Sequence, residues 1–190
     1  MNDTQIMDAL TRATAIRKGH FQLTSGRHSD TYVQCARILE DPQLTTELAQ
    51  QMVARLPDDS FDLVVAPAVG GIIIGFAVAQ TLGVPFLFTE RQEGVMVLRR
   101  GFEIPPAARV LIVEDVVTTG GSVQEVVDLV QAAEARVAAV ATVIDRGGDR
   151  AFDADYYPLL AMQVDSWLPS ECAACQAGLP LDSPGSRRLG

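Results

Sequence analysis

Histidine and cysteine are scarce in this chain of 190 residues, which holds two histidines and three cysteines. The odd number of cysteines predicts no disulfide framework, and the N-terminus lacks the basic and apolar regions of a signal peptide, so we expect a cytoplasmic location. Cys172 and Cys175 have the spacing of a zinc knuckle, but His20 and His28 lie far away in the sequence. We therefore expect reduced cysteines in a C-terminal loop and no metal there.

Long apolar runs and the common phosphate-binding motifs are also absent. The longest apolar stretch, residues 70–79, is too short and too rich in glycine to cross a bilayer, so we expect no membrane partner. No Gly-x-x-x-x-Gly-Lys-Ser/Thr motif occurs, which disfavours a P-loop NTPase. No Gly-x-Gly-x-x-Gly motif follows an expected strand, which disfavours a dinucleotide-binding fold.

Positive charge is in short supply. The chain has 15 Lys and Arg residues against 24 Asp and Glu residues, so its net charge is −9. Such an acidic protein is not expected to bind nucleic acid or an anionic membrane. Hydrophobic residues make up 48% of the chain, which is enough for one domain with a substantial core.

Apolar patterning predicts an alternation of helices and strands. We expect helices over 3–17, 42–56, 72–82 and 122–135, and strands over 62–66, 84–88, 95–98, 109–113, 137–144 and 156–164. Strands separated by helices predict an α/β fold with a mostly parallel sheet that is covered on both faces.

The two ends of the chain differ from this alternating part. The segment 18–34 is polar and rich in turn residues, which predicts a short hairpin or lid over the sheet. We expect a single domain over 1–190, with an N-terminal helix and hood in 1–40, the ligand-binding core in 60–150 and an irregular tail in 166–190.

Residues 110–122 form the most informative segment, Val-Leu-Ile-Val-Glu-Asp-Val-Val-Thr-Thr-Gly-Gly-Ser. Four apolar residues predict a buried strand, and Glu114 and Asp115 follow where it should end. The acids can accept hydrogen bonds from two adjacent ribose hydroxyls, while the loop amides and the next helix N-terminus can hold a phosphate. We favour a sugar-phosphate site over acids that only cap a helix.

Three other segments carry candidate ligand groups. The turn 66–71 has glycines that let the backbone approach a pyrophosphate, although alone it reads equally well as a packing turn. The loop 90–102 holds three arginines, which favours a mobile lid over a solvated hairpin. Arg146 follows an expected strand and can pair with a planar carboxylate, but in isolation an exposed arginine at a helix start is the commoner case.

The segment 110–122 resembles the phosphoribosyl-pyrophosphate (PRPP) signature of type I phosphoribosyltransferases. Over 16–186 the chain resembles the bacterial orotate phosphoribosyltransferase family, through Gly-His-Phe at 19–21, Leu-Thr-Ser-Gly-Arg-His-Ser at 23–29, and Asp145-Arg146. The closing Ser166-Trp167, Glu171-Cys172 and Pro184-Gly185-Ser186 resemble the tail of one branch.

This resemblance implies a type I phosphoribosyltransferase fold, in which helices flank a central, mostly parallel sheet and the N-terminal segment forms a small hood. It implies transfer of the 5-phosphoribosyl group from PRPP to orotate in de novo pyrimidine (UMP) biosynthesis, which releases pyrophosphate. It further implies Mg²⁺ as the cofactor and a homodimer with shared active sites.

The resemblance also implies residue roles. PRPP would contact Val69, Gly70, Arg91, Glu114, Asp115, Val116, Val117, Thr118, Thr119, Gly120, Gly121 and Ser122. Orotate would contact Thr24, Ser25, Gly26, Thr118 and Arg146. Catalysis would rest on Asp115 and on Arg91, Arg99 or Arg100 reaching pyrophosphate across the dimer interface, with Mg²⁺ held through the substrate and by Asp115. The reaction needs no side-chain nucleophile, and we expect the cysteines to lie away from the site.

Two departures and three alternatives remain open at this point. Many family members carry lysines where this chain has Thr24 and Gly70, and their lid is richer in lysine, which leaves open which cation stabilises the departing charge. The alternatives are a phosphoribosyltransferase for a purine base, a PRPP-sensing regulator that binds nucleic acid, and an inactive scaffold. The acidic charge disfavours the regulator, and the intact acid pair disfavours the scaffold.

Overall fold

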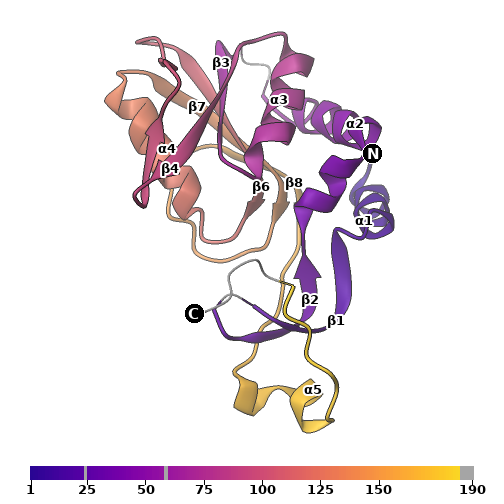
Figure 1. The fold of residues 1–190 in the computed structure, drawn as a ribbon. Helices are drawn as coiled ribbons and strands as arrows, with labels where there is room; N and C mark the ends of the chain where they lie inside the picture. Colours follow the sequence, from indigo (N-terminus) through magenta and orange to yellow (C-terminus); the bar gives the residue numbers. More distant parts are fainter. Residues whose placement is uncertain (24, 58–59, 185–190) are drawn as a thin grey trace.

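A six-stranded sheet forms the centre of the computed structural model, which describes residues 1–23, 25–57 and 60–184 (Figure 1). The strand order is β5-β4-β3-β6-β7-β8, with β5 antiparallel to β4 and the other neighbours parallel. The strands are β3 (Leu63–Pro67), β4 (Phe86–Gln92), β5 (Val95–Leu98), β6 (Arg109–Val117), β7 (Arg136–Asp145) and β8 (Tyr156–Ala161). The predicted α/β fold with a mostly parallel sheet is confirmed.

Helices cover both faces of this sheet (Figure 1). The helices α1 (Asp3–Arg12), α2 (Pro42–Val53) and α3 (Gly71–Leu82) bury their apolar side chains in one cluster, and α4 (Gly121–Ala132) buries its valines in the other. In α4 these valines recur three and four residues apart, so they form a single apolar stripe. None of the described helices combines the length and the hydropathy needed to cross a membrane.

The N-terminal hairpin forms a small second sheet below the main one (Figure 1). Its strands β1 (Ile16–Gln22) and β2 (His28–Val33) are antiparallel, as the hood prediction requires. The C-terminal segment, with the short helices η2 (Pro169–Glu171) and α5 (Ala173–Gln176), lies against both outer edges of this hairpin. Backbone bonds of 2.8 Å join His28 to Trp167 in both directions, and Asp182 bonds to His20 and Gln22. The sequence did not predict this docking.

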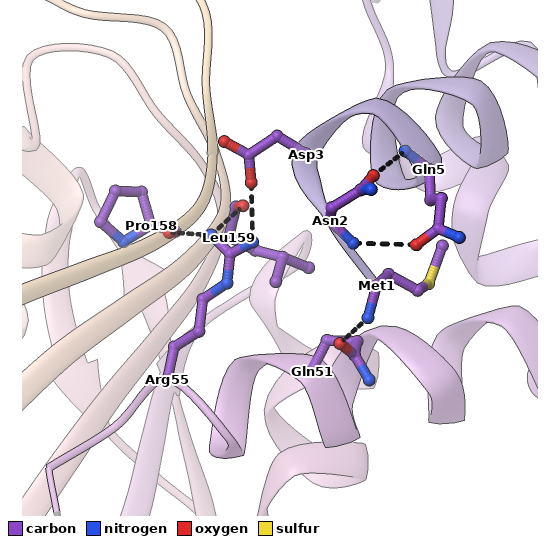
Figure 2. Close-up of polar contacts among 8 residues, drawn as sticks. All are labelled: Met1, Asn2, Asp3, Gln5, Gln51, Arg55, Pro158 and Leu159. Atoms are coloured by element: carbon purple, nitrogen blue, oxygen red, sulfur yellow. Dashed lines mark hydrogen bonds and ion pairs between the residues drawn. The ribbon is translucent and has the colours of Figure 1, made fainter.

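Polar contacts fix the N-terminus to the main sheet (Figure 2). The side chains of Asn2 and Gln5 form a reciprocal capping box at the start of α1. The guanidinium of Arg55 donates to the carbonyl oxygen of Leu159 in β8 at 2.6 Å and to the carboxylate of Asp3 at 2.8 Å. The terminal amine of Met1 donates to Gln51 in α2. These bonds tie α1, α2 and the edge strand β8 together.

Two expected element bounds are wrong in ways that matter for the site. The first helix ends at Arg12 rather than at residue 17, because Thr14 takes a left-handed conformation with φ 56° and the chain then enters β1. The central strand continues to Val117 rather than ending at Val113, because Val116 and Val117 still pair with Ile144 and Asp145 of β7. The acid pair therefore lies inside the strand.

A third bound differs in β4, next to the outermost strand β5. The strand expected over 84–88 begins at Phe86 and continues to Gln92, since it pairs with β5 as a hairpin. Arg91 is therefore part of a strand, and the loop between β4 and β5 is a short turn at Glu93 and Gly94.

Candidate functional site

The carboxyl ends of β3, β6 and β7 lie side by side, because these strands are parallel neighbours in the sheet. Ligands in open α/β sheets bind at this edge. The turn after β3, the loop 118–122 after β6 and Arg146 after β7 therefore meet there. A cleft of about 290 Å³ is lined by that loop together with Glu114, Arg91 and Glu125.

The acid pair combines one buried and one half-buried carboxyl group. Glu114 is only 8% exposed, and its Oε1 accepts the backbone N–H of Asp115 at 3.1 Å. Burial and the neighbouring charge of Asp115 raise the pKa of Glu114 well above its usual range. Asp115 accepts the backbone N–H of Val116 at 2.8 Å. Two adjacent, partly buried carboxyl groups are stabilised when they bind a proton, a cation or the hydroxyl groups of a ligand.

The turn after β3 runs directly over this acid pair. A Cβ atom added to Gly70 would lie 2.6 Å from both carboxylate oxygens of Asp115, and one added to Gly71 would lie 3.0 Å from the carbonyl oxygen of Val113. The Ala68–Val69 peptide bond is cis, and Val69 is 82% exposed at the top of the turn. In this arrangement a side chain at position 70 would force the carboxylate of Asp115 to move.

The loop after β6 leads into α4 with an open helix N-terminus. Gly120 has φ 73°, and a Cβ atom there would lie 2.6 Å from the ring of Phe152. The backbone carbonyl of Thr119 accepts the N–H of Ala151 at 2.8 Å, which holds the loop in place. No side chain caps α4, so its first N–H groups point outward with the positive end of the helix dipole.

Arg146 is the cation placed at the end of β7. Its backbone N–H donates to the carbonyl oxygen of Val117 at 2.9 Å, which joins it to the acid-pair strand. Its Nε is buried and has no hydrogen-bond partner in the described residues. Burial lowers the pKa of this guanidinium, and nearby Tyr32 and Cys35 raise it in part. A half-buried guanidinium whose buried Nε–H is unpaired is suited to receive a ligand carboxylate.

Cys35 lies beside the acid pair, so the expectation that all cysteines lie away from the site is wrong. Its Sγ is 3.7 Å from the carbonyl oxygen of Asp115. The thiol is buried, and burial together with Asp115 and Glu114 raises its pKa well above the usual range. The thiol therefore stays protonated and is not a nucleophile. Nothing in the sequence links Cys35 to residues 80 positions away.

The three arginines of the β4–β5 hairpin divide into two sets. The guanidinium of Arg91 donates to both carboxylate oxygens of Glu125 in α4, at 3.0 and 2.5 Å, on the wall of the cleft. Arg99 and Arg100 instead approach the carboxylate of Glu90, at 4.0 and 3.2 Å. Only Arg91 therefore lines the described cleft of its own chain, among these three.

The hood supplies the remaining expected orotate contacts. Ser25 and Gly26 form the turn between β1 and β2, where Gly26 has φ 77°. The next residue, Arg27, donates from Nε to the hydroxyl of Ser166 in the C-terminal segment at 2.9 Å. Thr24 and the Gly185-Ser186 part of the tail resemblance lie outside the described residues. The chain has a single lysine, Lys18, which bonds to Asp30 and Thr31 within the hood.

Comparison with known sequences gives matches along the whole chain. The family described as phosphoribosyl transferase domain matches residues 36–168. A curated relative from Chlorobaculum parvum, named orotate phosphoribosyltransferase, is 46% identical over 188 residues, which are 98% of this chain and 97% of the relative. A relative of the same name from Heliobacterium modesticaldum is 46% identical over 190 residues, with 98% and 100% coverage.

Solved structures show the same fold. The crystal structure of orotate phosphoribosyltransferase from Aeropyrum pernix has a TM-score of 0.73 at 22% identity and covers 82% of this chain and 93% of that chain. The adenine phosphoribosyltransferase from Thermoanaerobacter pseudethanolicus has a TM-score of 0.62 at 19% identity, with 70% and 88% coverage. These likenesses concern the fold, which is shared by enzymes named for different bases.

The raised pKa of Glu114 predicts a pH-dependent stability. A carboxyl group that keeps its proton in the folded state stabilises the protein less as pH rises from the ordinary value of 4.5 toward the raised one. The Glu114→Gln variant does not lose this stability. Its melting temperature should therefore exceed that of the wild type by an amount that grows as pH rises, about 2–4 °C for each kcal/mol of unfolding free energy that the wild type loses. Thermal melts of the metal-free protein between pH 4 and 8 measure this effect.

The exposed Glu103 provides the matched control for that experiment. Glu103→Gln should melt in parallel with the wild type at every pH. A constant difference between Glu114→Gln and wild type across the series would show that Glu114 ionises normally in the folded protein.

Proposed function

Since this chain belongs to the phosphoribosyltransferase family, and within it to the orotate phosphoribosyltransferases, we propose how its own residues carry out that activity. The enzyme transfers the 5-phosphoribosyl group of PRPP to orotate and produces orotidine 5-phosphate and pyrophosphate. The observation that carries the proposal is the meeting of Glu114-Asp115, the Gly70 turn and the open N-terminus of α4 at one sheet edge.

PRPP would lie along this edge with each of its parts against a different element. The ribose hydroxyls would donate to Glu114 and Asp115, which lie inside β6 near its carboxyl end. The 5-phosphate would accept from the amides of the loop 118–122 and from the first turn of α4. The pyrophosphate would accept from the backbone of the turn at Val69 and Gly70, which lies next to Asp115.

Orotate would lie between this edge and the hood. The unpaired Nε of Arg146 supports a charge-assisted bond to the carboxylate of orotate. Ser25 and Gly26 of the hood turn, with Thr118, would contact the ring. Adenine carries no carboxylate, so a half-buried arginine with an unpaired Nε at this place favours orotate over the purine alternative.

The acid pair also fits a divalent cation. Mg²⁺ prefers oxygen ligands and keeps water in its shell, and the carboxylate of Asp115 with the diol and pyrophosphate oxygens of PRPP would hold it. When bound, Mg²⁺ would neutralise the charge that the pyrophosphate gains as it leaves. Burial of Glu114 beside Asp115 supports this proposal, because a nearby cation relieves the unfavourable ionisation of such a pair.

Catalysis would come from placement and charge. The sugar carbon C1 gains positive character as its bond to pyrophosphate breaks, and the ring nitrogen of orotate attacks it without a protein nucleophile. The chain's own contribution is to hold both substrates in line and to surround the leaving group with backbone amides and arginines. The protonated thiol of Cys35 takes no covalent part.

The small-molecule partners would be PRPP and orotate, and the site would work in the cytoplasm. The net charge of −9 supports the absence of nucleic acid or anionic membranes among the partners, because both require a basic surface. Cell fractionation tests the location, and a gel shift at low salt tests nucleic-acid binding.

Asp115→Asn tests the role of the acid pair. The amide keeps the shape of the side chain but loses the charge that grips the diol and the metal, so we expect turnover to fall about 10²- to 10³-fold. The melting temperature should stay near that of the wild type, because Asp115 is half-buried at the sheet edge. Steady-state kinetics with PRPP, orotate and Mg²⁺ measure the change, and the surface variant Asp128→Asn is the control. Undiminished turnover would remove the assigned role.

Arg146→Ala tests recognition of the orotate carboxylate. Loss of a charge-assisted bond should raise the KM for orotate about 10- to 100-fold and change the KM for PRPP much less. Arg150→Ala is the matched control, because Arg150 lies four residues on and its guanidinium sits over the ring of Tyr156 instead. Equal increases in both KM values for Arg146→Ala would rule out the carboxylate contact.

A homodimer with shared sites is the last part of the proposal. Arg99 and Arg100 do not line the cleft of their own chain, which supports their reaching a partner's pyrophosphate. Mixing Asp115→Asn subunits with Arg99→Ala/Arg100→Ala subunits should then restore about a quarter of wild-type activity, because half the dimers are mixed and each has one intact site. Each variant alone should stay inactive. If verified mixed dimers recover no activity, the arginines act in the site of their own chain instead.

A further inference from the structure

Four metal-binding side chains from opposite ends of the chain converge in the hood. His20 lies in β1, His28 in β2, and Cys172 and Cys175 in the C-terminal segment. One ligand atom from each residue lies within 4.8 Å of all the others. The sequence analysis favoured metal-free cysteines because His20 and His28 lie far from Cys172 and Cys175 in the sequence, but the fold brings the two pairs together.

Four of the six separations between these atoms are within about 0.5 Å of the edges of a zinc tetrahedron. Nε2 of His20 lies 3.1 Å from Nδ1 of His28, 3.4 Å from Sγ of Cys172 and 3.6 Å from Sγ of Cys175, and Sγ of Cys175 lies 3.1 Å from Nδ1 of His28. With Zn–N near 2.0–2.1 Å and Zn–S near 2.3 Å, a tetrahedron has edges of about 3.3 Å between nitrogens and about 3.6 Å between nitrogen and sulfur.

The hydrogen bond on the far side of the His20 ring orients it for metal binding. Nδ1 of His20 lies 3.1 Å from the carbonyl oxygen of Leu179, so this nitrogen carries the proton and donates it. In the neutral ring, Nε2 then has a free lone pair, and that lone pair faces His28 and the two sulfurs. Metal-binding histidines are usually oriented by a partner of this kind.

Hydrogen bonds alone would satisfy this cluster poorly. Three groups lie within hydrogen-bonding distance of the single lone pair on Nε2 of His20, and one donor can use it well. His20, His28 and Cys172 are buried, at 7%, 4% and 2% exposure, so water cannot readily replace the missing partners. A central cation would accept all four lone pairs at once.

We propose that His20, His28, Cys172 and Cys175 bind one Zn²⁺ as a structural Cys2His2 site. Two sulfur and two nitrogen ligands favour zinc over Mg²⁺ or Ca²⁺, which prefer oxygen. Four protein ligands leave no open coordination position, which distinguishes a structural zinc from a catalytic one. Cys175 is exposed, and it provides the route by which the metal enters.

The zinc would join the C-terminal segment to the hood. Apart from the backbone bonds at Trp167 and Asp182, that segment has short helices of three and four residues and exposes Leu179 and Leu181. A metal cross-link between distant parts of a chain adds to the hydrogen bonds that already hold such a segment. The same segment bonds Arg27, next to the hood turn, through Ser166.

Metal analysis of the untagged, reduced wild-type protein tests the proposal directly. We expect about one zinc per chain by mass spectrometry of the metals, and Co²⁺ exchanged into the site should give the intense visible absorption of a tetrahedral thiolate complex. Absence of bound zinc, together with no uptake of added Zn²⁺ or Co²⁺, would overturn the proposal. So would a Co²⁺ spectrum of octahedral type without thiolate ligands.

Paired cysteine variants identify the ligands. Cys172→Ser/Cys175→Ser should lose the metal and the cobalt absorption, whereas Cys35→Ser should keep both because Cys35 lies at the acid pair instead. Limited proteolysis should cut the C-terminal segment after residue 166 faster in the double variant and in chelator-treated wild type. Retention of full metal content by the double variant would contradict the assignment. Metal content is measured without substrates, so the result tests the zinc proposal independently of the orotate assignment.

Discussion

The fold of the site depends on the close approach between Asp115 and the backbone at Gly70. With no Cβ atom at position 70, the turn after β3 can lie within contact distance of the acid pair inside β6. This contact places the groups proposed for pyrophosphate and for ribose side by side, next to Glu114, whose burial raises its pKa. Before any ligand binds, the site therefore holds two neighbouring carboxyl groups without a paired cation among the described residues. Such a site favours a cation and the hydroxyls of a sugar over an anion alone.

The net charge of the chain makes the position of each arginine important. With one lysine, and that lysine held at Asp30 and Thr31 in the hood, the cations near the sheet edge are arginines. Arg146 is half-buried and keeps an unpaired Nε–H, whereas Arg91 is paired with Glu125 on the surface of the cleft. A fixed arginine suits selection of a carboxylate, and a solvent-screened pair that can exchange partners suits a leaving pyrophosphate.

Short-range patterns predicted most of the main sheet and the helices that cover it, because the spacing of apolar residues along the chain differs between strands and helices. Val123, Val126, Val127 and Val130 mark α4, and the run from Val110 marks β6. The errors came from long-range pairing: β6 continues through the acid pair because β7 supplies partners, and Cys35 reaches Asp115 through tertiary packing. No sequence signal reports either contact. The glycines of the turn after β3 and of the loop 118–122 were predictable as sites of close approach, but the atoms they approach were not.

Prediction from sequence is limited in the same way for the hood. Its two strands were predictable, but its attachment to the C-terminal segment was not. The hairpin β1–β2 has its own register, yet both outer edges are covered by a segment that begins more than a hundred residues later. A histidine pair and a cysteine pair in separate segments look unrelated in sequence, and only the docking of Trp167 and Asp182 brings them together. A hairpin with a small core of its own is free to shift on the sheet edge. A metal that ties it to the tail would therefore determine how rigidly the hood turn meets the position beside Arg146 that we propose for orotate.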